Sequence, residues 1–220
     1  MQTIDLARVV VAIAAGYFIG GIPFGIIITR LIGGTDPRTI GSGRTGGANV
    51  SRAVGFRWAA VSGLLDVAKA SVAVLIVIAI GGDSVAQVGA ALAAIVGHSR
   101  SPYIGLHGGR GVAPATGGVL IIQPLVLVAM FPVFILIILI TRISSLGSLS
   151  ASLMGGVTMI VITAVTPLAP IYYVYGICGA GLIWLFHMDN IGRLFRGEER
   201  RIGGRHGKTE DGAGGTAAGA

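Results

Sequence analysis

The chain has 220 residues, of which 53% are hydrophobic and only 11% are charged. Since a soluble domain carries about 25% charged residues, this composition excludes an ordinary soluble protein and predicts an integral membrane protein. The formal net charge of +7 would suggest nucleic-acid binding in a soluble domain, but here the basic residues lie almost entirely between apolar runs. We therefore expect anionic lipid or a phosphorylated substrate, and no nucleic acid, as the partner of these basic residues.

The apolar runs predict an all-α membrane protein with about seven transmembrane helices, because about 20 apolar residues cross the hydrocarbon core as a helix. Pro23 is expected to kink the first helix. The third and fourth are short, and the fourth and fifth could instead form one kinked helix, which would leave six spans. The predicted segments are 4–32, 57–80, 84–97, 112–122, 124–141, 148–165 and 169–187.

The basic residues favour seven spans over six. With seven, the gaps 34–57, 98–111 and 142–147 and the C-terminal segment 188–220 share one side, and the opposite side offers only Arg8. Cytoplasmic loops carry an excess of arginine and lysine, so we expect the N-terminus outside and the C-terminus in the cytoplasm. Residues 1–203 are predicted to form one membrane-embedded domain. The Gly/Ala-rich residues 204–220 are predicted to be a disordered cytoplasmic tail.

The first cytoplasmic segment contains "GSGRTGGAN" at 41–49, whose glycines permit turns that point backbone N–H groups at one anion. Asn49 is a candidate N-cap of a helix that would add its dipole to this anion site. Neutral hydrogen bonds would come from Ser42 and Asn49. The alternative is a flexible, solvated basic loop. The candidate cations are Arg38, Arg44 and Arg52.

The second segment, 97–118, has the same pattern of two glycines, a cation and a helix start, at Gly108, Gly109 and Arg110. His98 ends the third predicted helix and His107 lies in the loop. A lone loop histidine is more often exposed or capping. Because no carboxylate or cysteine joins these histidines at ligand spacing, we expect no metal site.

The third segment, 187–203, begins with His187 where the last predicted helix leaves the membrane. Asn190 follows three residues later, so both side chains would face one side of a continuing helix. The alternative is an amphipathic helix that lies with its basic face on anionic lipid. The arginines that follow are Arg193, Arg196, Arg200 and Arg201.

Two charges, Asp66 and Lys69, lie three residues apart inside the second apolar run. Buried charges in a membrane are costly, so we expect an ion pair within the helix bundle, with proximity to the site as the alternative. No Ser/His/Asp triad or cofactor motif is visible, and we expect no cofactor. The residues alone predict three cytoplasmic segments that together hold a small phosphorylated molecule.

The segments together resemble the bacterial acyl-phosphate:glycerol-3-phosphate acyltransferase family, the PlsY type. The matching stretches are "GIPFG" at 21–25, "DPRTIGSGRTGGANVSR" at 36–52, "GHSRSPYIGLHGGRGVAP" at 97–114 and "HMDNIGRLFRGEE" at 187–199. The resemblance implies a seven-helix fold in the bacterial plasma membrane with its site facing the cytoplasm. It also implies acyl transfer from fatty acyl phosphate to the sn-1 hydroxyl of glycerol 3-phosphate, with lysophosphatidic acid and phosphate as products.

By position in these motifs, the resemblance also implies which residues act. His187, His98 and Asn190 are the catalytic candidates, and the base is His187, His98 or the donor's own phosphate. An acyl-phosphate-forming enzyme is a candidate partner. The implied phosphate-binding residues are Arg38, Ser42, Arg44, Asn49, Arg52, Gly108, Gly109 and Arg110.

The chain departs from the family's motifs at several positions. The asparagine after G-S-G is Arg44 here, a threonine is Ala48, the G-G-K-G lysine is Arg110, the threonine after it is Pro114, and the serine of the first motif is Gly21. Either the phosphate contacts are rearranged, or the substrate differs, or activity is reduced. Two alternatives therefore stay open: a catalytically altered or inactive family member, and a membrane transporter or binding protein for a phosphorylated metabolite.

Overall fold

The computed structural model describes residues 5–202, and all regular structure in that range is helical. Residues 1–4 and the predicted tail at 204–220 lie outside the described residues. Two 3₁₀ turns, η1 (Pro37–Thr39) and η2 (Pro102–Ile104), lie in the loops. The α-helices are α1 (Leu6–Gly21), α2 (Phe24–Leu31), α3 (Gly47–Val54), α4 (Phe56–Ala79), α5 (Ser84–Ser99), α6 (Val112–Ile122), α7 (Leu125–Thr141), α8 (Ser144–Val165), α9 (Ile171–Phe186) and α10 (Met188–Phe195).

Every predicted apolar segment contains a helix, which confirms the all-α membrane architecture. Three helical stretches are long and apolar enough to cross a bilayer, namely Leu6–Leu31, Phe56–Ala79 and Ser144–Val165, and the bent pair of α9 and α10 is a possible fourth. The helices α6 and α7 are shorter and separate, with Gln123 and Pro124 between them. The count of seven spans stays a prediction.

The first span is broken at Pro23, as expected from its sequence. Because proline has no N–H to donate and crowds the preceding turn, α1 ends at Gly21 and α2 starts at Phe24. The break leaves backbone carbonyls inside the bundle without helical partners. Ser101 Oγ donates to the Gly21 carbonyl at 2.6 Å, and Lys69 Nζ donates to the Ile22 carbonyl at 2.7 Å.

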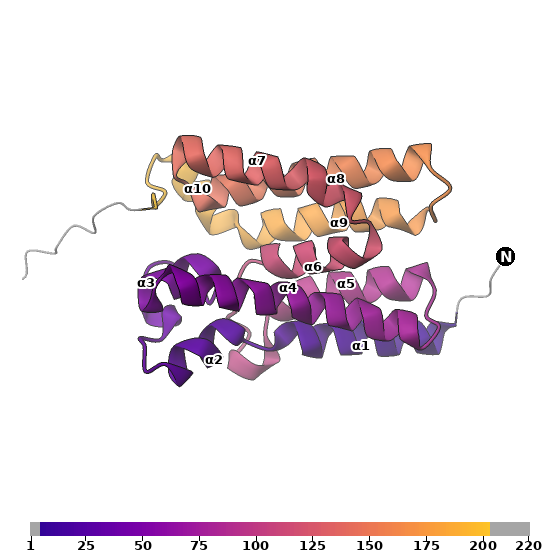
Figure 1. Cartoon of the computed structure of the whole chain (residues 1–220), viewed down its shortest axis with the longest axis horizontal. Helices are drawn as coiled ribbons and strands as arrows, with labels where there is room; N and C mark the ends of the chain where they lie inside the picture. Colours follow the sequence, from indigo (N-terminus) through magenta and orange to yellow (C-terminus); the bar gives the residue numbers. More distant parts are fainter. Residues whose placement is uncertain (1–4, 203–220) are drawn as a thin grey trace, which may run out of the picture.

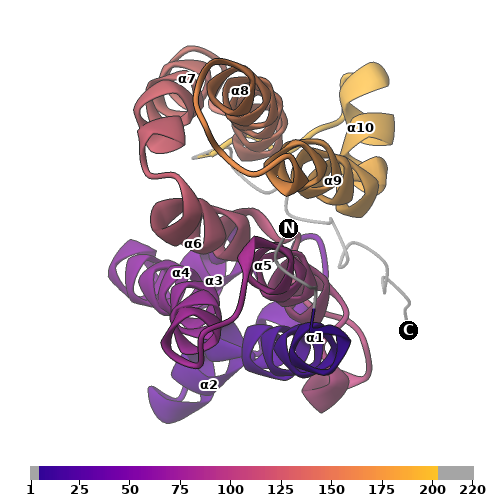
Figure 2. The same cartoon turned by 90° about the vertical axis from the view of Figure 1, so that its right-hand side faces the viewer.

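The helices form two groups, which meet at α6 and where α5 packs against α9. One group holds α1 to α5, and the other holds α7 to α10 (Figures 1 and 2). Between α1 and α5 the backbones approach closely through small residues, as is typical of membrane helices. A side chain on Gly97 would collide with the carbonyl oxygen of Tyr17, and one on Gly20 would meet Ala94.

We expect Gly97→Ala to lower thermal stability, because the added methyl group forces α1 and α5 apart. Overpacking of this kind costs about 1–3 kcal/mol. The midpoint of thermal unfolding in detergent measures the effect. Gly63→Ala in α4 is the matched control, since its methyl group would meet no heavy atom within 4 Å. Equal midpoints for the two variants would contradict this account of the α1–α5 contact.

Candidate active site

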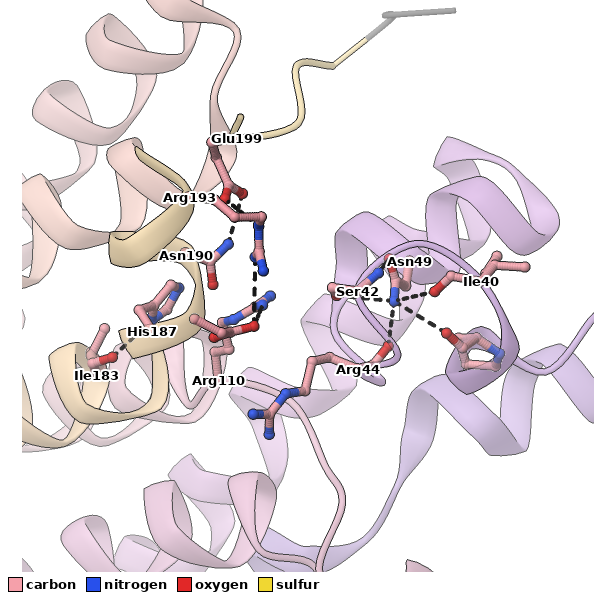
Figure 3. A network of polar contacts seen from close by, with 12 residues as sticks. Ile40, Ser42, Arg44, Asn49, Arg110, Ile183, His187, Asn190, Arg193 and Glu199 are labelled. Carbon is pink, nitrogen blue, oxygen red and sulfur yellow. Dashed lines mark hydrogen bonds and ion pairs between the residues drawn. The ribbon is translucent and has the colours of Figure 1, made fainter. Parts of the chain in front are cut away.

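The three predicted segments meet at one end of the molecule, where α3 and α10 lie (Figure 1). The Arg44 side chain points from the first segment across the space between the two groups of helices, toward Arg110 (Figure 3). Burial lowers the pKa of the Arg110 guanidinium most, and the positive charge of Arg44 adds to that lowering. Segments that are far apart in sequence thus form one basic surface.

Asn49 organises the first segment from within α3. The expectation that Asn49 caps this helix is wrong, because α3 starts at Gly47 with Gly46 as its N-cap. The Asn49 side chain instead turns back into the loop, where the residue is 2% exposed. Its Nδ2 lies 2.9–3.1 Å from four acceptors, of which its two hydrogens can serve two at once. These acceptors are the carbonyls of Pro37, Ile40 and Arg44 and the hydroxyl of Ser42.

The three arginines of this segment differ in how firmly they are held. Arg38 bonds to Asp36, with Nη2 2.7 Å from Oδ2, and this contact lowers the pKa of the Asp36 carboxyl. Arg52 donates to Asn49 Oδ1 at 2.7 Å. Within residues 5–202, Arg44 makes no ion pair. Arg44 is therefore the least constrained of these three side chains.

In the second segment, Arg110 lies against α10 of the other helix group. Its Nη2 is 2.8 Å from Asp189 Oδ2, and Arg193 Nη2 is 3.5 Å from the same oxygen. The buried Nε of Arg110 has no hydrogen-bond partner among the residues described. Asp189 was not among the residues predicted from the sequence, although its spacing of four residues from Arg193 on a helix indicates such a pair.

His98 and His107 differ in their surroundings. His98 is 7% exposed and its Nδ1 lies 3.0 Å from Lys69 Nζ, inside the first helix group. Lys69 and Asp66 form the predicted ion pair at 2.6 Å, which confirms that expectation. His107 is exposed and contacts the carbonyl of Gly105 in its own turn. That contact matches the capping interpretation of a loop histidine.

The third segment bends at His187, so the prediction of a continuing helix is wrong. The axes of α9 and α10 differ by 64° at this residue. His187 Nδ1 is 2.7 Å from the Ile183 carbonyl. A carbonyl only accepts, so Nδ1 carries a proton and Nε2 is the nitrogen that could accept one.

Glu199 was not predicted either, and it ties the residues that follow α10 back to that helix. Its carboxylate accepts from Asn190 Nδ2 at 2.7 Å and from Arg193 Nε at 2.8 Å, with its side chain only 7% exposed. The Oδ1 atom of Asn190 is buried without a partner in the described part of the chain. Asn190 therefore keeps a free acceptor (Figure 3).

Comparison with known proteins identifies the family. The family model described as glycerol-3-phosphate acyltransferase matches residues 10–197. The chain belongs to this acyltransferase family. A relative of that name from Anaeromyxobacter sp. (strain K) is 39% identical over 194 residues, which cover 86% of this chain and 95% of the relative.

Two crystal structures are similar to this acyltransferase over most of its length. Both are of PlsY, described as an integral membrane glycerol 3-phosphate acyltransferase, and both are 32% identical and cover 89% of this chain. The glycerol 3-phosphate form has a TM-score of 0.80 with 96% of its chain covered. The lysophosphatidic acid form has a TM-score of 0.78 with 95% covered.

Proposed function

We propose that this acyltransferase moves a fatty acyl group from acyl phosphate to the sn-1 hydroxyl of glycerol 3-phosphate. Lysophosphatidic acid and inorganic phosphate are the products. The observation that carries the proposal is the convergence of three basic segments around Arg110 at one end of the helix bundle. The similar PlsY structures, described as glycerol 3-phosphate and lysophosphatidic acid forms, support the acceptor and the product.

Phosphate groups would bind between the first and second segments. Arg44 and Arg110 face this space from opposite sides, and arginine forks match phosphate oxygens in pairs (Figure 3). Arg52 and Ser42 lie at the Asn49 side of the same loop. Arg38 contributes charge while it stays bonded to Asp36. Because Asp189 already holds Arg110, binding needs little rearrangement of that side chain.

The chemistry needs no covalent enzyme intermediate, because acyl phosphate is already an activated donor. The sn-1 oxygen attacks the carbonyl carbon, the bond from that carbon to the phosphate oxygen breaks, and phosphate leaves with the electron pair. Rate would come from proximity and from arginines that stabilise the developing negative charge. The hydroxyl proton passes to His187 Nε2 or to the donor phosphate. Both ring nitrogens of His98 face the protein interior, which favours another role for it.

The acyl chain would lie among the membrane helices next to the site. An apolar crevice between α6, α8 and α9 is lined by small residues, including Ala115, Gly156 and Gly176, and by Ile183. His187 follows Ile183 by one helical turn, so the crevice leads toward the third segment.

The site faces the cytoplasm of a bacterium in this proposal, with seven spans in the plasma membrane and the N-terminus outside. Its support is the excess of arginines in the loops and short helices around α3 and α10. At the other end, Arg8 donates to the carbonyl of Gly81. An acyl-phosphate-forming enzyme would supply the donor from the same side.

The proposal is tested with purified protein, palmitoyl phosphate and labelled glycerol 3-phosphate. We expect labelled lysophosphatidic acid, one phosphate released per product, and no product when palmitoyl-coenzyme A replaces the acyl phosphate. Bound glycerol 3-phosphate without product would identify an inactive family member. Product from palmitoyl-coenzyme A alone would contradict the donor proposed here.

A further inference from the structure

A charged cluster lies buried beneath the second segment and has no part in the chemistry described above. Asp66 and Lys69 of α4 have side chains that are 5% and 2% exposed, with their charges 2.6 Å apart. Burying two charges in a membrane bundle costs more desolvation free energy than their attraction regains. Charged residues at such positions therefore usually have a functional role. The other contacts of Lys69 indicate what that purpose is.

Lys69 joins three parts of the first helix group. An ammonium group has three hydrogens, and Lys69 Nζ has three acceptors: Asp66 Oδ1, the Ile22 carbonyl at 2.7 Å and His98 Nδ1 at 3.0 Å. His98 Nδ1 lies 3.5 Å from Asp66 Oδ1, farther than from Lys69. Nδ1 is therefore the acceptor of a lysine hydrogen, which places the ring proton of His98 on Nε2.

His98 in turn supports the loop that carries Arg110. The backbone N–H of Gly109 donates to the His98 carbonyl, and that of Gly108 donates to the Ser99 carbonyl, both at 3.1 Å. The loop also packs directly on the ring, because a Cβ on Gly109 would collide with His98 Nε2. The two glycines are thus required by close contact with His98, and Arg110 is the next residue.

We propose that Asp66, Lys69 and His98 form a buried brace that positions the 108–110 loop, and through it Arg110, for phosphate binding. In this inference, which rests on the proposed role of Arg110, His98 is a positioning residue and not the base. The brace fixes the ring through Nδ1, and the ring fixes the backbone of Gly109. Because the backbone of Gly109 is fixed, the next residue, Arg110, is held where its side chain contacts Asp189 of the other helix group.

Two substitutions of His98 separate positioning from proton transfer. The side-chain amide introduced by His98→Asn keeps an acceptor oxygen near the position of Nδ1, whereas His98→Leu offers Lys69 none. We expect His98→Leu to raise KM for glycerol 3-phosphate about tenfold and His98→Asn to stay within about threefold of the wild type. If His98 were the base, both variants would lose kcat alike, and that result would overturn the inference.

Hydrogen exchange gives a readout that does not depend on activity. In His98→Leu, the amides of Gly108 and Gly109 should exchange about tenfold faster than in the wild type, with His98→Asn in between. Ser71→Ala is the matched control, because it removes a buried hydrogen bond from α4 to the Gly117 carbonyl, away from the loop. Unchanged exchange at both glycines in His98→Leu would overturn the inference.

The double variant Asp66→Asn, Lys69→Met serves if His98→Leu does not fold, since it removes both charges together. It should speed the same two amides, and exchange equal to that of the wild type would overturn the inference. Arg110→Ala tests the phosphate-binding role of Arg110 independently of the brace. If the loop loosens in His98→Leu but Arg110→Ala leaves KM unchanged, the brace stands and the phosphate-binding role of Arg110 fails.

Discussion

Arg110→Ala is expected to lower kcat/KM for glycerol 3-phosphate by about 100-fold, the largest effect of any single arginine in the site. A charge-assisted hydrogen bond contributes about 1.5–3 kcal/mol, and the variant also leaves the Asp189 carboxylate without its closest partner. Initial rates of lysophosphatidic acid formation with purified protein, at varied glycerol 3-phosphate, measure the change.

Two further variants make the Arg110 measurement specific. Arg110→Lys keeps the charge but loses the planar fork, so its kcat/KM should lie between those of the wild type and Arg110→Ala. Arg196→Ala removes an exposed arginine that pairs with Glu198 on the same surface, and it should stay within about twofold of the wild type because such pairs contribute little. Full turnover by Arg110→Ala would refute the phosphate-binding assignment.

The second large effect is expected from Asn49→Leu, which has a similar volume but no polar atoms. The variant removes the two hydrogen bonds that Nδ2 can donate at once to the carbonyls of Pro37, Ile40 and Arg44 and the hydroxyl of Ser42. It also removes the acceptor of Arg52. Each buried polar group left without a partner destabilises the folded loop by about 1–3 kcal/mol. We therefore expect the loop to become disordered in this variant. We expect kcat/KM to fall by about 100-fold, and limited proteolysis to cut the loop before α3.

Thr39→Ala is the control for Asn49→Leu. It removes one exposed hydrogen bond of the same loop, to the Asp36 carbonyl, and should leave both kcat/KM and the proteolysis pattern close to those of the wild type. If Asn49→Leu kept its KM and resisted protease, the loop would not depend on the Asn49 amide.

The helices of the bundle follow from the apolar runs, because a membrane span needs only length and hydropathy. The start of α8 was predicted at residue 148 and lies at Ser144. Serines made this stretch look polar, yet Ser148 satisfies its hydroxyl on the Ser144 carbonyl one turn earlier. A serine hydroxyl that bonds to the carbonyl of the preceding turn is no longer exposed to its surroundings, whereas a mean hydropathy value treats it as fully polar.

The site was predictable in composition but not in its contacts. Glycines and arginines identified the three segments, whereas Asp189 and Glu199 become important only because folding places them against Arg110 and Asn190. The Asn49 side chain could as well have capped its helix, since a short polar side chain bonds whichever backbone groups the fold presents. Which of these hydrogen bonds forms depends on contacts with residues that are distant in sequence.

The break at Pro23 has a consequence for the order in which the protein is made. The carbonyls of Gly21 and Ile22 are completed by Ser101 and Lys69, which leave the ribosome much later. The Ile22 carbonyl also accepts from the Phe24 N–H at 3.1 Å, whereas the Gly21 carbonyl has Ser101 as its partner among the described residues. An unsatisfied carbonyl in lipid costs several kcal/mol, so the break at Pro23 is fully stabilised only when the η2 segment is in place. We therefore expect the N-terminal helices to reach their final packing only after the segment that carries Ser101 has been made.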